Sequence, residues 1–142
     1  MEYVILDIET TGLDRENSSI LEVGAIHISN NSIVDRFSSF VRYTDEIPET
    51  IRRLTGITEE MVKNAPPLDE VIKKLQNFIK GHPAIAHYGF SFDFPILERD
   101  GLKIKEKYDS LEFSFFVLPT SLHGHSITVL SEYFGLEKSP HR

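Results

Sequence analysis

Two acidic residues at the end of an apolar segment constrain this chain more than any other feature. Asp7 and Glu9 stand in Tyr-Val-Ile-Leu-Asp-Ile-Glu-Thr-Thr-Gly-Leu, residues 3–13. Side chains alternate between the faces of a strand, so both carboxylates project from one side and Ile8 from the other. Each anion raises the proton affinity of the other. A hard cation such as Mg²⁺ or Mn²⁺ removes that cost, because it prefers carboxylate oxygens.

A plainer interpretation is that Asp7 and Glu9 are two solvated acids where a strand emerges into a loop. The segment before them, Tyr3–Ile8, is apolar on both faces apart from Asp7, as in a central strand. A Thr-Thr-Gly turn follows directly. This context favours a metal site over the plainer interpretation.

Composition limits the class of protein. With 142 residues, 40% hydrophobic and 26% charged, the chain fits one globular domain. It has no cysteine, which excludes disulfides, thiolate metal sites and cysteine nucleophiles. The apolar runs are too short to span a bilayer and no signal-like segment opens the chain, so we expect a cytoplasmic protein with no membrane partner.

The net charge bears on nucleic-acid binding. The formal charge of −7, from 15 basic and 22 acidic residues, argues against a passive nucleic-acid binder that relies on a basic face. The charge is compatible with an enzyme that binds phosphates through metal ions, because the ions invert the local charge.

Residue periodicity predicts an α/β fold with a mixed five-stranded sheet covered by helices. The expected strands are Tyr3–Ile8, Ile20–Ile28, Ser32–Val41, Ala84–His87 and Lys105–Tyr108. The expected helices are Pro48–Leu54, Glu59–Lys63, Leu68–Lys80, Phe92–Asp100, Ser110–Leu118 and Ser126–Phe134. A tight turn at Asn30-Asn31 joins the second and third strands. We expect the helices from Leu68 to Phe134 to supply most of the core, and the acids to lie at the carboxyl end of the first strand.

Three motifs spread over the whole chain carry a family resemblance. They are Asp-Ile-Glu-Thr-Thr-Gly-Leu at residues 7–13, Ala-His-Tyr-Gly-Phe-Ser-Phe-Asp-Phe-Pro-Ile-Leu at residues 86–97, and a segment from Leu130 to Leu136 that is followed by Pro-His-Arg at residues 140–142. Ile20–Ala25 and Leu54–Thr58 add two shorter segments. Together these resemble the DEDDh 3′–5′ exonucleases, the DnaQ-like family that includes polymerase proofreading subunits, ribonuclease T and helicase-fused domains.

The resemblance implies a ribonuclease H-like fold and a two-metal 3′–5′ exonuclease that releases nucleoside 5′-monophosphates, with DNA as the expected substrate. Asp7, Glu9 and Asp93 would hold two divalent ions, Mg²⁺ or Mn²⁺. His141 would be the general base, a role that suits a group titrating near neutrality. Asp93 can also be interpreted simply as a helix N-terminal acid.

The implied partners are single-stranded 3′ ends and a polymerase or helicase, in the same or another chain. The residues placed at the substrate are Thr10, Thr11, Gly12, Leu13, His87 and Tyr88. The first four would form the wall of the terminal-nucleotide pocket, where small groups approach sugar and phosphate closely. His87 would support the site, with a plain buried histidine as the alternative.

Two departures from the family pattern stand out. Tyr88 occupies the position of a usual Asn, and we expect it to stack on a nucleobase or pack over the pocket mouth. The family places a fourth acid five residues beyond the catalytic histidine, whereas this sequence ends one residue after His141. We therefore expect residues 1–142 to be a single exonuclease domain truncated before its last helix, folded but nearly inactive. If it is fully active, some acid within the chain, such as Asp100 or Asp109, must supply the missing ligand.

Three other interpretations remain. A degenerate nuclease domain that acts as an interaction module is favoured by Tyr88 and by the missing acid, and opposed by the retained catalytic set. Haloacid-dehalogenase-like phosphatases also carry acids at this spacing, but they have Asp where this chain has Glu9. His123-Gly124-His125 is a poor zinc site because it stands in a loop without a further soft ligand. His27 and His82 are interpreted as ordinary surface or strand residues.

Overall fold

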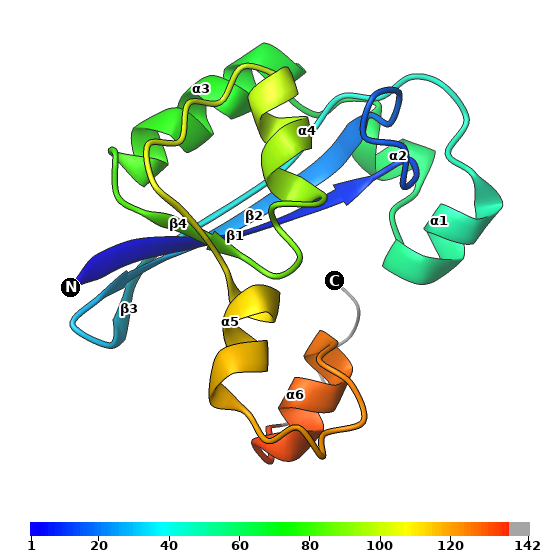
Figure 1. Ribbon diagram of the computed structural model, residues 1–142. Coiled ribbons are helices and arrows are strands. Elements are labelled where there is room, and N and C mark those ends of the chain that lie inside the picture. Colours follow the sequence, from blue (N-terminus) through cyan, green and yellow to red (C-terminus); the bar gives the residue numbers. More distant parts are fainter. Residues whose placement is uncertain (137–142) are drawn as a thin grey trace.

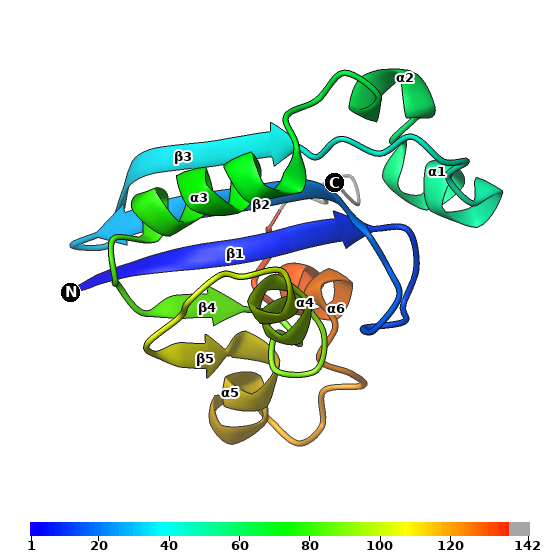
Figure 2. The same cartoon turned by 90° about the horizontal axis from the view of Figure 1, so that it is seen from above.

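Five strands form one mixed sheet in the computed structural model, which describes residues 1–136. The strands are β1 (Glu2–Thr10), β2 (Ile20–Ser29), β3 (Ser32–Phe40), β4 (Ala84–Ala86) and β5 (Lys107–Asp109). Their order across the sheet is β3-β2-β1-β4-β5 (Figure 2). β1, β2 and β3 are antiparallel neighbours, whereas β4 pairs with β1 and β5 with β4 in parallel. The predicted mixed five-stranded sheet, with the first strand at its centre, is confirmed.

The turn between β2 and β3 follows from its two asparagines. Asn30 has a φ of 49° and Asn31 a φ of 64°. Two successive residues with positive φ make a two-residue turn whose twist matches the flanking strands, and asparagine tolerates that conformation better than most residues. Ser29 therefore pairs directly with Ser32.

Residues 1–136 contain six helices. They are α1 (Glu49–Thr55), α2 (Glu59–Val62), α3 (Leu68–Ile79), α4 (Asp93–Arg99), α5 (Ser110–Val117) and α6 (Ile127–Tyr133). α3 and α4 lie on one side of the sheet, whereas α5 and α6 lie on the other (Figure 1). Each expected helix and strand is present, with bounds that differ from the expected ones by two residues or fewer.

The main core lies between the sheet and the helices α3 and α4. Val4, Leu6 and Ile8 alternate along β1 and are all buried there. They pack in one cluster with residues of α3 and α4 such as Leu75 and Phe94. Burial of such side chains typically contributes about 1.5–3 kcal/mol each. This cluster fixes which face of β1 is inside, and with it the face that Asp7 and Glu9 occupy.

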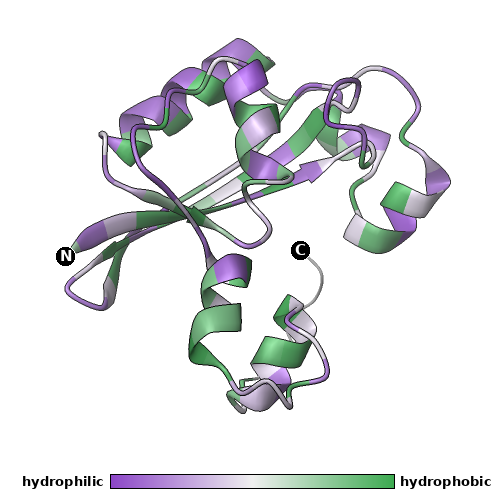
Figure 3. Ribbon diagram, viewed as in Figure 1, coloured by the Kyte–Doolittle hydropathy of each residue, from purple (hydrophilic) through white to green (hydrophobic). Residues whose placement is uncertain are grey.

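The expectation that the helices through Phe134 supply most of the core is wrong for α5 and α6. Ser114 is the buried residue of α5, and α6 contributes none. Phe116 of α5 is 87% exposed. α5 is hydrophobic over most of its surface (Figure 3), so its sequence contains no single apolar stripe that would indicate a covered side. The spacing of α3, by contrast, places its apolar residues on one face.

A membrane-spanning role finds no support in the helices of residues 1–136, since none combines the length and the apolar character that crossing a bilayer requires.

Candidate active site

The carboxyl end of β1 carries the predicted acids. Ile8 is buried, so Asp7 and Glu9 lie on the opposite face of the strand, where Asp7 is exposed and Glu9 half-buried. In the register with β2, Asp7 stands opposite Gly24 and Glu9 opposite Glu22. Directly opposed residues in a sheet share a face, so Glu22 adds a third acid beside Glu9. The sequence analysis missed Glu22, although the hairpin register points to it.

Asp93 reaches this end of β1 from the first position of α4, as a helix N-terminal acid. Its side chain is only 4% exposed. The backbone N–H of Ile8 donates a hydrogen bond to Asp93 Oδ1 at 3.2 Å. Burial, and after it the negative charge of Asp7, together raise the pKa of Asp93 to about 7. The two carboxylates are therefore close enough to compete for protons.

The turn that leads from β4 into α4 is tightly packed around Gly89. A Cβ on Gly89 would lie 2.5 Å from the Cβ of Ala86 and 2.8 Å from Cε2 of Phe94, closer than side-chain carbons pack. Tyr88, just before it, has a φ of 63°, in the left-handed region that Asn and Gly adopt readily. This tight turn brings Asp93 back toward β1.

Asp109, at the end of β5, holds that turn in place. Its buried carboxylate accepts backbone N–H bonds from Tyr88 at 3.0 Å, from Leu111 at 2.9 Å and from Phe90 at 3.1 Å. Asp109 thus caps α5 and supports the loop that precedes Asp93. The sequence analysis considered it only as a substitute metal ligand; its place directly before a helix was the missed signal. Asp100 instead pairs with Arg99.

Arg99, at the end of α4, connects the helix to the β1–β2 loop. Its guanidinium donates to the carbonyl oxygens of Arg15 at 2.7 Å and of Ser18 at 2.9 Å. The helix that begins with Asp93 is therefore anchored to the loop that follows Glu9.

Among the predicted substrate-binding residues, those in the β1–β2 loop organise the loop itself. Thr10 Oγ1 donates to the carbonyl of Gly12 at 2.6 Å, and Thr11 Oγ1 accepts from the N–H of Ser19 at 3.0 Å. Leu13, in the same loop, is 86% exposed. The predicted role of these residues as a pocket wall stays a prediction.

His87 and Tyr88 follow β4. His87 is half-buried, and its Nδ1 lies 3.1 Å from Ser110 Oγ. Burial lowers the pKa of His87, against the opposing charges of Asp109 and Asp7, so the neutral imidazole is favoured. Tyr88 is 55% exposed. It is therefore a surface side chain rather than part of the core.

The remaining predicted residues are distributed as follows. His141 lies outside the described residues. His125 packs against α5, with its Nδ1 2.8 Å from Ser114 Oγ and its ring 4.0 Å from that of Phe115. Within residues 1–136, one group of three potential ligand side chains has donor atoms that all lie within 4.8 Å of one another. It is not the predicted catalytic set but a different cluster, at the other end of β1.

The donor chemistry of the acids fits oxygen-preferring divalent ions. Asp7, Glu9 and Asp93 offer only carboxylate oxygens, the ligands of Mg²⁺ and Mn²⁺. Burial, and after it the charge of Asp7, raise the pKa of Asp93 and so disfavour its ionised form, a cost that a cation would offset.

Sequence comparisons place the whole chain in one family. The family model for the RNase T exonucleases, described as exonuclease, matches residues 4–142. The PolC-type DNA polymerase III of Caldanaerobacter subterraneus subsp. tengcongensis is 39% identical over 144 residues, which cover 99% of this chain and 10% of the polymerase. The PolC-type enzyme of Bacillus cereus is 32% identical over 145 residues, 98% of this chain and 10% of that protein. The chain thus spans about a tenth of these relatives.

Solved structures agree on the fold. The E. coli ExoI–ssDNA complex in its zinc-bound form superposes with a TM-score of 0.83 at 14% identity, over 99% of this chain and 37% of that one. Exonuclease X in complex with 5′ overhanging duplex DNA gives a TM-score of 0.75 at 24% identity, over 96% of this chain and 75% of that one. The fold is ribonuclease H-like, and the chain belongs to the RNase T exonuclease family of DnaQ-like 3′–5′ exonucleases.

Proposed function

We propose that this chain hydrolyses single-stranded DNA from its 3′ end by two-metal catalysis, releasing nucleoside 5′-monophosphates. The observation that carries the proposal is the buried Asp93 carboxylate, which accepts the N–H of Ile8 between Asp7 and Glu9 on β1 and whose pKa burial and the charge of Asp7 raise to about 7. Such an arrangement is costly for folding and is typical of sites that bind cations or move protons. The PolC-type polymerases and the ExoI–ssDNA complex support a DNA substrate.

In this proposal, Asp7, Glu9 and Asp93 hold two Mg²⁺ or Mn²⁺ ions, which when bound supply an activated water and stabilise the leaving 3′ oxygen. Asp93 must lose its proton to take part, and the Ile8 N–H favours the ionised form that results. His141 accepts the proton of the attacking water. The loop at residues 10–13 confines the terminal nucleotide beside these groups.

A second candidate function is that of an interaction module in a polymerase or helicase assembly. The exposed phenylalanines of α5, Phe113 and Phe116, favour it, because large apolar side chains on a surface commonly mark contact sites. The relation to PolC-type enzymes makes a polymerase, in the same or another chain, the first partner to consider. A chain that binds a polymerase can also be a nuclease. The interaction function therefore replaces the catalytic one only if the chain has no nuclease activity.

A nuclease assay tests the proposal. The protein, in excess over a 5′-labelled single strand so that slow turnover is measurable, is incubated with Mn²⁺ or Mg²⁺. We expect a ladder of strands shortened from the 3′ end, nucleoside 5′-monophosphates as products, and complete inhibition by chelator. Asp7→Asn, purified in parallel, controls for contaminating nucleases. Cleavage of a circular strand, or activity that persists in excess chelator, contradicts this mechanism.

Tyr88 provides a prediction about substrate binding. Stacking of an exposed aromatic side chain on a base typically contributes about 1–3 kcal/mol. We therefore expect Tyr88→Ala to raise the KM for short oligonucleotides by about 5- to 160-fold, which is that energy range expressed as a ratio. Tyr88→Asn should fold well, because asparagine adopts the positive φ found at this position. An unchanged KM in Tyr88→Ala, at unchanged stability, rules out the stacking role.

A further inference from the structure

We propose that Glu2, His27 and His82 form a second metal site, selective for Zn²⁺-like ions and separate from the catalytic acids. Glu2 begins β1, His27 lies in β2, and His82 precedes β4. Asp7 stands five residues further along β1, and at about 3.3 Å per residue the two sites are about 17 Å apart along the strand. The proposal is therefore independent of the nuclease function.

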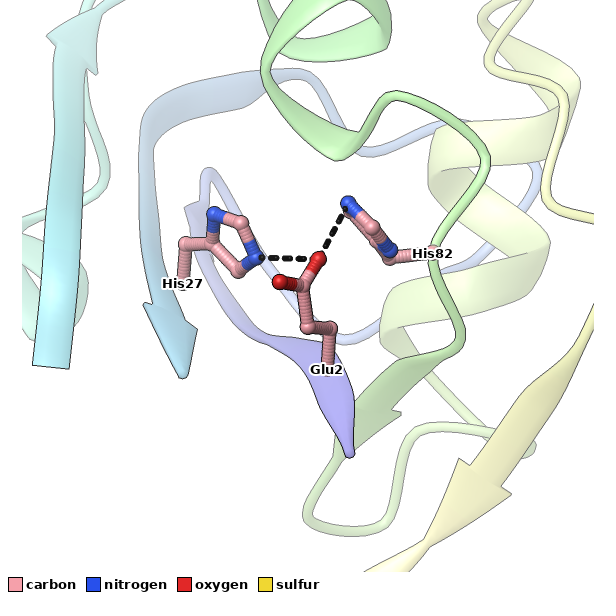
Figure 4. Close-up of side chains that lie close together, drawn as sticks. All are labelled: Glu2, His27 and His82. Atoms are coloured by element: carbon pink, nitrogen blue, oxygen red, sulfur yellow. Dashed lines mark ion pairs between the residues drawn. The ribbon is translucent and has the colours of Figure 1, made fainter. Parts of the chain in front are cut away.

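The two distances from Glu2 to the histidines suit a tetrahedral ion. Glu2 Oε2 lies 3.1 Å from His82 Nε2 and 3.7 Å from His27 Nε2. Atoms bound at about 2.0–2.1 Å to a tetrahedral Zn²⁺ lie about 3.3 Å apart, midway between these two values. All three donor atoms lie within 4.8 Å of one another. Figure 4 shows the Glu2 carboxylate between the two histidines, with ion pairs drawn from one of its oxygens to the Nε2 atom of each ring.

The environment of His27 gives a second, independent observation. Its Nε2 is buried and makes no hydrogen bond within residues 1–136; Glu2 Oε2, at 3.7 Å, lies too far away for one. A buried ring nitrogen without a hydrogen bond costs free energy. Its lone pair faces the same space as the donor atoms of Glu2 and His82, so a bound cation would satisfy it.

Surrounding groups hold each donor in place. Ser29 Oγ donates to the other carboxylate oxygen of Glu2 at 3.1 Å. The ring of His27 packs edge-on against Phe78 of α3, with centroids 6.4 Å apart. His82 follows a left-handed turn at Lys80 and Gly81, and its N–H donates to the carbonyl of Ile79 at 2.9 Å. Ordered supports of this kind are typical of metal ligands.

The ligand types decide the ion. Two imidazoles and one carboxylate suit Zn²⁺ and related transition metals, whereas Mg²⁺ prefers oxygen ligands alone. The Glu2 side chain is half-exposed, so water can occupy the fourth coordination position of the ion. Because the three ligands join β1, β2 and the segment after α3, a bound ion would crosslink the end of the sheet remote from the catalytic acids.

Zinc titration in excess Mg²⁺, which occupies the carboxylate site, tests the proposal in the 142-residue chain. We expect calorimetry to show one Zn²⁺ equivalent whose affinity falls at least about 100-fold in His82→Ala, because loss of a ligand should cost no less than the roughly 10- to 100-fold lost when a group that merely orients a ligand is removed. Glu2→Gln should weaken binding as well. His123→Ala, which removes an exposed histidine outside the cluster, is the matched control and should bind as the wild type does.

Two further readouts separate the site from nonspecific binding. In ¹⁵N NMR spectra, Zn²⁺ should shift the Nε2 signals of two histidines, and His82→Ala should abolish both shifts. Zn²⁺ should also raise the Tm of the wild type but not of His82→Ala, since it binds the folded form. Equal Zn²⁺ affinity in the wild type and His82→Ala, or no saturable binding in the wild type, overturns the proposal.

Discussion

Asp7→Asn is expected to lower the rate of 3′-end hydrolysis at least about 10³-fold, because a ligand lost from a catalytic metal site costs several kcal/mol of transition-state stabilisation. The asparagine side chain is nearly isosteric and Asp7 is exposed, so the fold should remain intact. Removing its charge also lowers the pKa of Asp93 toward the usual value, since that charge helps to raise it. The metal-free variant should consequently unfold at a slightly higher temperature than the wild type.

Single-turnover rates of the wild type and Asp7→Asn, measured in Mn²⁺, give the effect, and thermal unfolding in chelator gives the stability. Asp45→Asn, an exposed acid far along the chain from the site, is the matched control and should retain the wild-type rate. A rate for Asp7→Asn within tenfold of the wild type removes Asp7 from the metal site. If neither protein cleaves DNA but both bind a polymerase through α5, the interaction-module function gains support instead.

The order of strands and helices was predictable because local signals agree with the global fold. The asparagine pair fixed one hairpin, and the apolar stripe of α3 indicated a covered face. α5 was predicted as a helix but its burial was not, since its apolar residues surround the axis. Such a pattern does not indicate which side of the helix packs against the sheet.

The site was predictable only in part, and for a similar reason. Asp7 and Glu9 share a strand, so their common face follows from the period of two. Residues that are brought together by strand register or by a chain crossover leave no local pattern in the sequence from which their contact could be predicted. Glu22 reaches Glu9 through the β1–β2 pairing, and His82 reaches Glu2 only after α3 has crossed the sheet. The sequence analysis accordingly treated His82 as an ordinary surface residue.

The stability of the metal-free protein is expected to fall by about 4 kcal/mol between about pH 4 and pH 7 through Asp93 alone. A rise in its pKa from 3.8 to about 7 corresponds to that free energy. Between these pH values the folded protein keeps the proton while the unfolded chain loses it. The unfolded state then binds fewer protons, so the free energy of unfolding decreases as pH rises, until both states are ionised above about pH 7.

Asp93→Asn should remove this dependence, because the amide does not ionise and its oxygen can still accept the Ile8 N–H. At pH 8 in chelator, the variant should therefore be more stable than the wild type by up to about 4 kcal/mol, which denaturant titration measures directly. Mg²⁺ or Mn²⁺ should stabilise the wild type at pH 8 and have a smaller effect on Asp93→Asn, since the ion binds the ionised carboxylate. Asp45→Asn should retain the wild-type pH profile. If the stability of Asp93→Asn declines with pH as that of the wild type does, the buried carboxylate is ionised throughout this range. Groups other than a metal ion then already neutralise the catalytic end of β1.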